Sequence, residues 1–590
     1  MPPRSLSLSS LLLPLLLGCA GLAPPGDAVA PAAPTRAEAA TSAAPRPPTA
    51  AEPGAAAAAR AAPPASAAST PPAPASSAPP APALSPPSPP YSAAVAARFP
   101  DPPVHYDVPG LAPGRTRFTS NDELAAVLRA LAARAGGPRV VPAGKSHEGV
   151  AIEALHFASP ATDTPPARPR PRVLLIGQQH GDEPAGAEAL LALAGQLAPG
   201  GALAPLLDRI EVVLLPRANP DGAVHGQRVG RHGSDINRDH LLLRTPEARA
   251  VAALVQAFDP AVVVDAHEHT VVGRYLEKFG AVQRNDLLLQ YATTANLPVS
   301  LTEAAETWFR QPLVAALTRA GLTQEWYYTN ALVPGDLRLA MGGVQPDTAR
   351  NVHGLRNAIS ILLETRGVGI GRLHLARRVH THVVALTSIL TEAAARAGDL
   401  LVLRDRAGVQ VAGSACRGEA VVLAGQTPGT REVVMLDPQS GADKALRVQW
   451  LSSLELRPLK TRARPCGYWL AADAEEAIAR LRALGVRIER LAEPRVLDAE
   501  GWTEITSVEA TRPDVLGRVA ERQTARLVQV ALAPRRLAAA AGSWYVPLDQ
   551  PLANLVLVAL EPDSPNSYFA NRLLPALDRA ARVLAPPGGR

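Results

Sequence analysis

The chain has 590 residues, a length that predicts about two to four domains rather than one. Its formal net charge of +6 is small for this length, and the sequence has no basic stripe with interleaved aromatic residues, so we expect no nucleic-acid partner. The 60 prolines are unevenly spread, and many of them lie near the N-terminus.

Residues 1–19 are typical of an export signal. Arg4 gives a positive start, and the apolar run Leu6–Leu17 is too short to span a bilayer. The run leads into Gly18 and Cys19, which resembles the bacterial lipoprotein signal, in which the cysteine is lipidated and becomes the new N-terminus. A plain secretory signal cut nearby is the alternative. Both predict export to the periplasm or cell envelope, and the first predicts a membrane anchor through a lipid on Cys19.

Residues 20–95 consist mainly of Ala, Pro and Ser, with few charges and few large apolar side chains. Such a segment cannot bury enough surface to offset its ordering entropy, so we expect a disordered tether. If Cys19 carries lipid, two cysteines remain, Cys416 and Cys466. An oxidising compartment allows them to pair, and two separate thiols are the alternative.

The first chemical signal follows an apolar run, Val173–Ile176, which predicts a buried strand. His180 and Glu183 lie in the turn after this strand, where ligands bind in open α/β sheets. A neutral imidazole and a carboxylate are two of the three protein ligands of a catalytic zinc. The alternative is a turn histidine and a glutamate that stabilises the start of a helix. Around this signal the sequence predicts helices over Asn121–Arg134 and Ala185–Leu197, and strands over Arg139–Val141 and Ile152–Ala158.

A loop rich in guanidinium groups follows the next predicted strand, Ile210–Leu215. Arg228 and Arg231 lie in it, and Asn237 and Arg238 come shortly afterwards. Arginine holds a carboxylate in a two-pronged fork that lysine cannot match. The loop therefore predicts an anion clamp, with a solvated basic loop as the alternative.

Another predicted strand, Ala261–Val264, follows a predicted helix and also ends on histidine. We expect His267 to be the third metal ligand, with His269 as the fallback because spacing alone cannot rank the two. Asp265 or Glu268 is expected to orient the ligand histidine from behind.

One more predicted strand, Asn357–Leu363, ends on Glu364. A carboxylate at the end of a buried strand is unfavourable unless it is paired or functional. Glu364 is therefore a candidate general base. A salt bridge from Glu364 to Arg366 or to an arginine at the end of a helix is the alternative.

Taken together, these elements resemble the zinc metallocarboxypeptidases of the carboxypeptidase A type, over about residues 172–369. The resemblance implies an α/β fold with a mixed central sheet flanked by helices. It implies one Zn²⁺ per chain, held by His180, Glu183 and His267. It further implies that Glu364 is the general acid/base, that Arg228 stabilises the oxyanion, and that Asn237 and Arg238 bind the terminal carboxylate of a peptide.

Three positions depart from the pattern of this family or cannot be placed. Gly230 stands where the family often has an asparagine, so Arg231 is an alternative to Arg228. The tyrosine that closes over substrate has only two candidates, Tyr327 and Tyr328. Arg350 either reaches the active site or lies on a helix surface.

We expect a catalytic domain over residues 96–398 and an accessory region over residues 399–590. In the accessory region, Leu401–Leu403, Val409–Val411, Val421–Leu423, Val433–Met435 and Val448–Trp450 predict short strands, after a long helix over Gly371–Arg396. The function we expect is zinc-dependent removal of C-terminal residues from peptides. The alternatives are an amidase or deacylase acting on N-acyl amino acids or cell-wall peptides, and a non-catalytic surface lipoprotein.

Overall fold

The computed structural model describes residues 90–159, 169–231, 233–511 and 524–588. The predicted signal of residues 1–19 and nearly all of the predicted tether lie outside the described residues. The described part of the chain belongs to one compact unit. Within this part, no helix has the length and apolar composition needed to cross a membrane.

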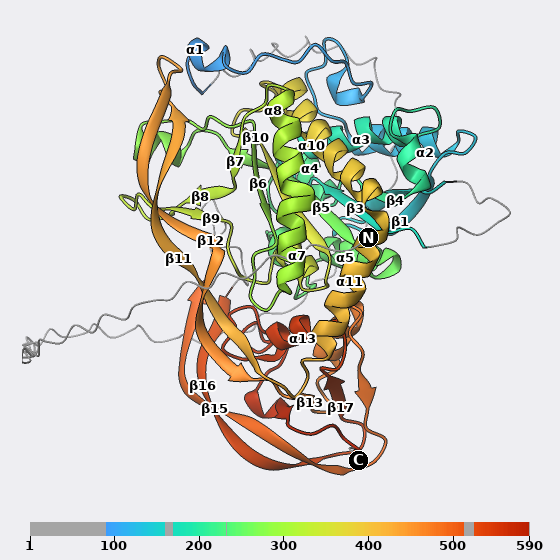
Figure 1. Cartoon of the computed structure of the whole chain (residues 1–590), viewed down its shortest axis with the longest axis vertical. Helices are drawn as coiled ribbons and strands as arrows, with labels where there is room; N and C mark the ends of the chain where they lie inside the picture. Colours follow the sequence, from blue (N-terminus) through green and yellow to red (C-terminus); the bar gives the residue numbers. More distant parts are fainter. Residues whose placement is uncertain (1–89, 160–168, 232, 512–523, 589–590) are drawn as a thin grey trace, which may run out of the picture. The chain divides into compact units, whose positions relative to one another are not determined.

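A mixed sheet of eight strands lies at the centre of the fold, in the order β1-β2-β4-β3-β5-β10-β6-β7 (Figure 1). Its middle strands β4, β3, β5 and β10 run parallel to one another, and their neighbours β2 and β6 run antiparallel to them. Strands covered on both faces are apolar almost throughout, as β3 and β4 are. The strands are β1 (Arg139–Lys145), β2 (Ala151–Phe157), β3 (Arg172–Gly177), β4 (Glu211–Leu215), β5 (Val262–Thr270), β6 (Leu287–Tyr291), β7 (Gln324–Trp326) and β10 (Ile359–Val368).

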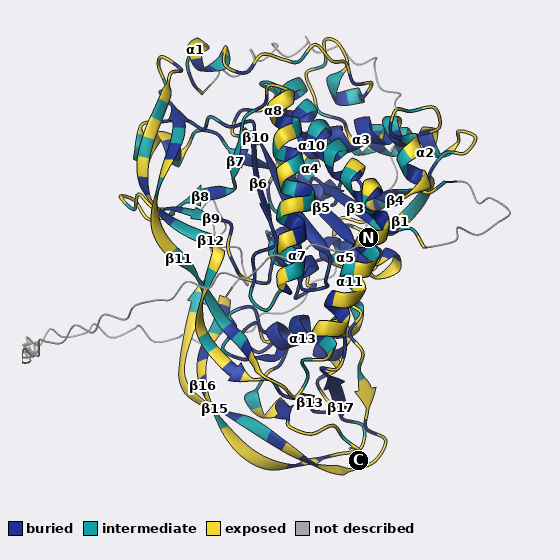
Figure 2. Cartoon of the chain, in the orientation of Figure 1, coloured by how far each residue is buried: buried dark blue, intermediate teal, exposed yellow. Residues whose placement is uncertain are grey.

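Helices cover both faces of this sheet, and the strands between them are buried (Figure 2). On one face, the apolar sides of α2, α3, α8 and α10 form the larger core with the strands. On the other face, α5 packs on the strands in a smaller core. The covering helices are α2 (Asn121–Ala132), α3 (Ala185–Leu197), α5 (Pro246–Phe258), α8 (Gln311–Arg319) and α10 (Leu375–Ala395).

Two further sheets contain the C-terminal strands. A four-stranded sheet, β11-β12-β9-β8, joins strands on both sides of the predicted boundary at residue 398, and a six-stranded sheet has the order β14-β17-β13-β18-β15-β16. In the first sheet are β8 (Tyr328–Asn330), β9 (Leu339–Met341), β11 (Glu419–Leu436) and β12 (Asp443–Ala463). In the second are β13 (Gly467–Leu470), β14 (Glu489–Arg490), β15 (Arg495–Thr511), β16 (Thr524–Ala539), β17 (Trp544–Pro547) and β18 (Ala580–Val583).

The remaining helices connect these layers. The two predicted regions share a hydrophobic core. The first region contributes Ile236 and Val352 to it, and the second contributes Tyr468, Val556 and Val558. The predicted boundary after residue 398 falls within the first turn of α11, which begins almost directly after α10 ends. These helices are α1 (Ala93–Ala96), α4 (Pro220–His225), α6 (Arg274–Phe279), α7 (Val299–Ala304), α9 (Ala349–Gly354), α11 (Ala397–Ala412), α12 (Glu475–Ala483) and α13 (Ala553–Leu560).

The predicted fold class, a mixed sheet flanked by helices with a β-rich C-terminal part, is confirmed. Two predicted strands are wrong, because Leu401–Leu403 and Val409–Val411 lie in helix α11. The buried residues of α11 include Leu400, Ala407 and Val411, and this is the spacing of one helical face. Apolar runs of three residues are too short to distinguish the alternating pattern of a strand from the buried face of a helix.

Cys416 and Cys466 form a disulfide across 50 residues of sequence. The structure therefore selects pairing over two separate thiols. The bond ties the end of α11 to the segment before β13, so it closes a loop that contains the whole β11–β12 hairpin. A crosslink of this kind reduces the conformational freedom of the unfolded chain.

Candidate metal centre and active site

The site is built where β3 and β5 reach the same edge of the sheet. Gly177 at the end of β3 pairs with Ala266 of β5, so the loop after β3 lies directly beside His267. The buried apolar residues of β3 hold this edge in place, and helix α3 begins at Ala185, immediately after the loop. Parallel strands therefore bring together two histidines that are 87 positions apart in the chain.

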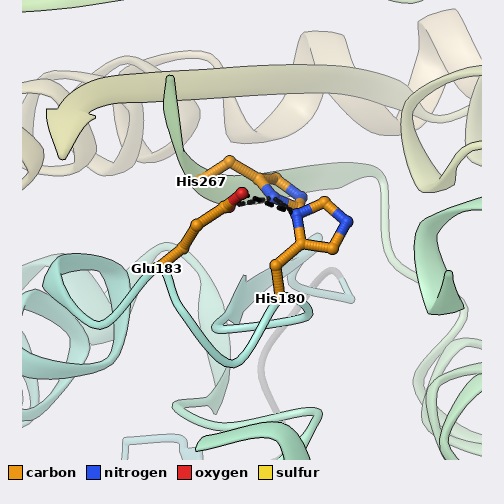
Figure 3. Close-up of side chains that lie close together, drawn as sticks. All are labelled: His180, Glu183 and His267. Carbon is orange, nitrogen blue, oxygen red and sulfur yellow. Dashed lines mark hydrogen bonds and ion pairs between the residues drawn. The ribbon is translucent and has the colours of Figure 1, made fainter. Parts of the chain in front are cut away.

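His180, Glu183 and His267 converge on one point (Figure 3). Their donor atoms all lie within 4.8 Å of one another. Glu183 places Oε1 2.8 Å from His180 Nδ1 and Oε2 2.8 Å from His267 Nδ1, and the two Nδ1 atoms are 3.0 Å apart. All three side chains are buried.

Both histidines are oriented by carboxylates on their far nitrogens. His267 Nε2 lies 2.7 Å from Asp265 Oδ2, and His180 Nε2 lies 3.1 Å from Asp235 Oδ1. Each Nε2–H donates to a carboxylate, which leaves each Nδ1 with a lone pair for a metal. Asp265 was predicted as one of two candidates for this role. The part played by Asp235 was missed, although its position two residues before Asn237 was visible in the sequence.

This arrangement fits a zinc ion. Two imidazole nitrogens and a carboxylate form a recognised catalytic donor set, and ligands 2.0–2.1 Å from a tetrahedral zinc lie roughly 3.3 Å from one another. The observed donor separations of 2.8–3.0 Å are close to this spacing. His269 is outside the group, because its Nδ1 approaches the carbonyl of Thr270 instead.

Arg228 lies against the donor group. Its Nη1 is 3.1 Å from Glu183 Oε1 and 3.0 Å from His180 Nδ1, and its Nη2 donates to Asp235 Oδ2 at 3.0 Å. By contrast, the side chain of Arg231 is 52% exposed and pairs with Glu148 at the surface. Of the two arginines, Arg228 is therefore the one at the site.

Glu364 faces the same centre from β10. It is the register partner of His267 on the adjacent parallel strand, so the two side chains project from the same face. Glu364 makes no ion pair with any residue that the structure describes, and Arg366 instead stacks on Phe99, with its guanidinium carbon 3.2 Å from the ring centroid. Burial raises the pKa of Glu364 to about 7 from its ordinary 4.5.

A zinc carboxypeptidase family model matches residues 124–241, a segment that includes His180 and Glu183 but ends before His267 and Glu364. The chain is 30% identical over 421 residues to a probable carboxypeptidase 2 from Arthroderma benhamiae, covering 71% of this chain and 78% of that protein. It is 29% identical over 435 residues to carboxypeptidase 2 from Trichophyton equinum, covering 73% and 79%.

The chain belongs to the zinc carboxypeptidase family. It is accordingly a zinc metallocarboxypeptidase, a hydrolase that acts on peptides by metal-dependent cleavage. Among solved structures it is similar to a metallo-carboxypeptidase from Burkholderia cenocepacia, with 21% identity, a TM-score of 0.35, and coverage of 46% of this chain and 68% of that one.

Two pockets of this zinc carboxypeptidase meet at Glu364. Both are lined by Arg228, Tyr327, Thr329 and Glu364. The first pocket extends from there over Asp182, Tyr275 and Asn330, and the second extends over Asn237, Arg238, Gly342, Gly343, Thr348 and Arg350. Of the metal donors, Glu183 lines the first pocket and His180 lines the second.

The two residues predicted to clamp a carboxylate both line the second pocket. Arg238 donates from Nη1 to the carbonyl of Asn237 at 2.7 Å. The side chain of Asn237 donates to Asp265 Oδ2 at 3.1 Å and accepts from the backbone of Ala349 at 2.8 Å. Asn237 thus connects the second pocket to the strand that carries His267.

The two candidates for the closing tyrosine occupy different surroundings. Tyr328 is fully buried, and its hydroxyl donates to Gln283 Oε1 at 2.9 Å. Tyr327 lines both pockets at their junction. Tyr328 also lines the first pocket, but its hydroxyl is held by Gln283, so Tyr327 is the candidate that reaches both pockets.

Proposed function

We propose that this zinc carboxypeptidase removes single residues from the C-termini of peptides, with His180, Glu183 and His267 as its metal ligands. The observation that carries the proposal is the position of Glu364. It stands beside His267 on the adjacent strand, faces the donor group, and lies where the two pockets meet. A bound Zn²⁺ supplies a Lewis acid that polarises the scissile carbonyl and makes a water nucleophilic near pH 7.

Glu364 would act first as base and then as acid. Its carboxylate takes a proton from the attacking water, and the resulting carboxylic acid returns that proton to the leaving amine. The raised pKa of Glu364, about 7, suits both steps because the group exchanges protons easily near neutral pH. Arg228 donates hydrogen bonds to the oxyanion that forms from the scissile carbonyl.

Substrate binding is assigned to the second pocket. Arg238 would hold the terminal carboxylate with its guanidinium fork, and Asn237 lies beside it. Since Asn237 also donates a hydrogen bond to Asp265, it would hold the carboxylate clamp at a fixed position relative to β5, the strand that carries His267. Tyr327 is the candidate that would close over the bound peptide.

The proposed activity is tested with purified protein and three measurements. The zinc content should be one ion per chain, a chelator should abolish hydrolysis, and added zinc should restore it. Peptides with a free C-terminal carboxylate should be cleaved, whereas the same peptides blocked as amides should not. Equal cleavage of both forms would favour an amidase, and metal-independent cleavage would contradict the proposal.

The variant Arg238→Ala tests the clamp. Loss of a charge-assisted fork should lower kcat/KM for free-acid peptides by about 100-fold, mainly through KM. The residual rate on amide-blocked peptides should change much less, because these lack the carboxylate. Equal losses on both substrates would remove Arg238 from this role.

We also propose that the protein is exported and anchored through a lipid on Cys19. The apolar segment Leu6–Leu17 supports export, and so does the disulfide between Cys416 and Cys466, since such bonds persist in oxidising compartments. Metabolic labelling with a radioactive fatty acid should mark the wild type and not Cys19→Ala. Labelling of both would contradict the anchor.

The division into a catalytic domain of residues 96–398 and an accessory region of residues 399–590 is a further proposal. Every residue given a catalytic or binding role above lies in the first part. The second part contacts the wall of the second pocket, where Ser453 Oγ of β12 donates to the carbonyl of Gly342 at 2.7 Å.

A further inference from the structure

Arg350 is a buried cation inside the second pocket. It lies at the start of α9 and is only 3% exposed. Its Nη2 donates to the carbonyl of Gly343 at 2.7 Å, and its Nε lies 3.4 Å from Asn351 Oδ1. Its Nη1 makes no hydrogen bond, and no carboxylate of the described chain lies within ion-pair distance of the guanidinium.

A buried guanidinium without an anionic partner is unfavourable. Charged groups are rarely fully buried unless they are paired, because the protein interior solvates them poorly. Burial lowers the pKa of Arg350 to about 10, and the positive charge of nearby Arg238 adds to this effect, while Tyr327, Asp347 and Glu364 act in the opposite direction. The second pocket therefore holds two guanidinium groups. The carboxylates of Asp235 and Asp347 favour the charge of Arg238, whereas Arg350 has no ion pair among the described residues and would be stabilised by an anion that reached it.

The backbone at Gly342 packs closely against the guanidinium group of Arg350. A Cβ atom on Gly342 would lie 2.4 Å from Arg350 Nη1 and 2.9 Å from Tyr327 Cδ1, so only glycine leaves room for both side chains. Gly342 is fixed by Gln290, which accepts from its N–H at 2.9 Å, and by Ser453, which donates to its carbonyl. Both ends of this glycine are thus held while Arg350 lies against it.

The rest of the lining argues against other side chains in this pocket. Glu364, at the junction with the first pocket, is the only acidic residue among the described residues that line the second one. A lysine or arginine side chain would find no anion deeper in the pocket. Leu362 is the one large aliphatic side chain in the lining, which gives little apolar surface for a leucine or phenylalanine.

We propose that Arg350 binds the side-chain carboxylate of an acidic C-terminal residue, so that the enzyme prefers peptides ending in glutamate or aspartate. Arg238 would hold the main-chain carboxylate of the same residue, and the two arginines together would receive its two negative charges. This inference rests on the proposed function, because it assigns the second pocket to the residue that is released.

The test compares substrates that differ only at the C-terminal residue. N-benzoyl-glycyl-glutamate and N-benzoyl-glycyl-glutamine have the same shape, and N-benzoyl-glycyl-leucine is an uncharged reference. For wild-type holoenzyme we expect kcat/KM for the glutamate substrate to exceed that for the glutamine substrate by about 100-fold, since a buried charged pair is being compared with a neutral group. Aspartate should rank above asparagine in the same way.

The variant Arg350→Gln should reduce the glutamate-to-glutamine ratio to about one, and Arg350→Lys should give an intermediate ratio because lysine keeps the charge but not the fork. Arg356→Gln is the matched control. Arg356 is also buried, and its guanidinium donates to the carbonyl of Leu484, outside the pocket. This control should leave the ratio at its wild-type value.

The outcomes separate this inference from the proposed function. Cleavage of the leucine substrate with no preference for glutamate over glutamine overturns the inference and leaves the carboxypeptidase activity standing. A loss in Arg350→Gln that is equal for all three substrates makes Arg350 part of the terminal clamp and also overturns the inference. If that variant fails to fold, the wild-type ratio decides, and a ratio near one overturns the inference. Failure to cleave any of the three removes both proposals.

Discussion

At the residue scale, the chemistry that we propose depends on Glu364 being buried but unpaired. Desolvation raises its pKa, and the absence of an ion pair in the described chain leaves the carboxylate available for proton transfer. Arg228 has the opposite character, because Glu183 and Asp235 both accept hydrogen bonds from it. Glu364 is thus able to exchange a proton near neutral pH, whereas Arg228 stays positively charged.

The variant Glu364→Gln should lose about 10³-fold in kcat while keeping its zinc, because the amide cannot take the proton and Glu364 is not among the donors. Zinc content and steady-state kinetics measure the two effects separately. Retention of more than about a tenth of the wild-type rate would remove Glu364 from the catalytic role, and loss of zinc would make it a ligand.

The pH dependence of kcat/KM should show an acidic limb that reports Glu364. Only the deprotonated carboxylate acts as base, so activity falls as pH decreases through its pKa. That pKa is about 7 in the metal-free site, and the charge of a bound Zn²⁺ favours the carboxylate and lowers it. The midpoint of the limb should therefore lie between 4.5 and 7. A profile that is flat from about pH 4 to pH 8 would contradict this assignment.

At the scale of elements, strand β5 contributes side chains to the metal site on one face and to a contact with helix α10 on the other. Asp265 and His267 project from one face toward the metal site, since residues two apart share a face. Glu268 projects from the other face, where Arg378 of α10 pairs with it at 2.6 Å. The same strand thus carries the site on one side and anchors a covering helix on the other.

The variant Asp265→Ala should weaken zinc binding by about 10- to 100-fold, because His267 loses the carboxylate that fixes its orientation. Asp265→Asn, which keeps an acceptor but not the charge, should lose less. Competition with a chelator of known affinity measures both. Unchanged affinity in Asp265→Ala would show that packing alone orients the ring.

At the scale of the whole molecule, residues 399–590 are joined to the preceding part of the chain through a shared core and a shared sheet. β9 pairs with β12, and Ser453 of β12 contacts Gly342 just beyond the end of β9. The disulfide between Cys416 and Cys466 closes the loop that contains this strand. Residues 399–590 therefore contact the wall of the second pocket, but the charged side chains in its described lining all come from the preceding part of the chain.

Replacing both cysteines with serine should lower the free energy of unfolding by about 4 kcal/mol, the loop-closure value for the 50 residues that the bond spans. Urea unfolding of zinc-loaded wild type and variant measures the difference. A change below about 1 kcal/mol would mean that the unfolded chain is already constrained without the bond.

Much of the fold could be predicted from local pattern. The strand before His180, the helix over Ala185–Leu197 and the strand that carries Glu364 all have buried apolar runs whose length and spacing are characteristic. The predicted end of the last strand at Leu363 is wrong, because β10 continues through Glu364 to Val368. The failures occurred where burial depends on distant partners. Leu401 and Val409 were assigned to strands because short apolar runs are ambiguous, and packing of α11 decides the matter.

The sequence by itself determined the family and indicated the candidate donors and their order, because these depend on residue identity and on the apolar runs of the strands. Only the tertiary structure decided which tyrosine lines both pockets, which of Arg228 and Arg231 lies beside the donor group, and that Arg350 is buried without an ion pair among the described residues. The physical reason is that residue type alone gives the ionisable group of a side chain, but its partners and its solvation depend on segments far away in the chain.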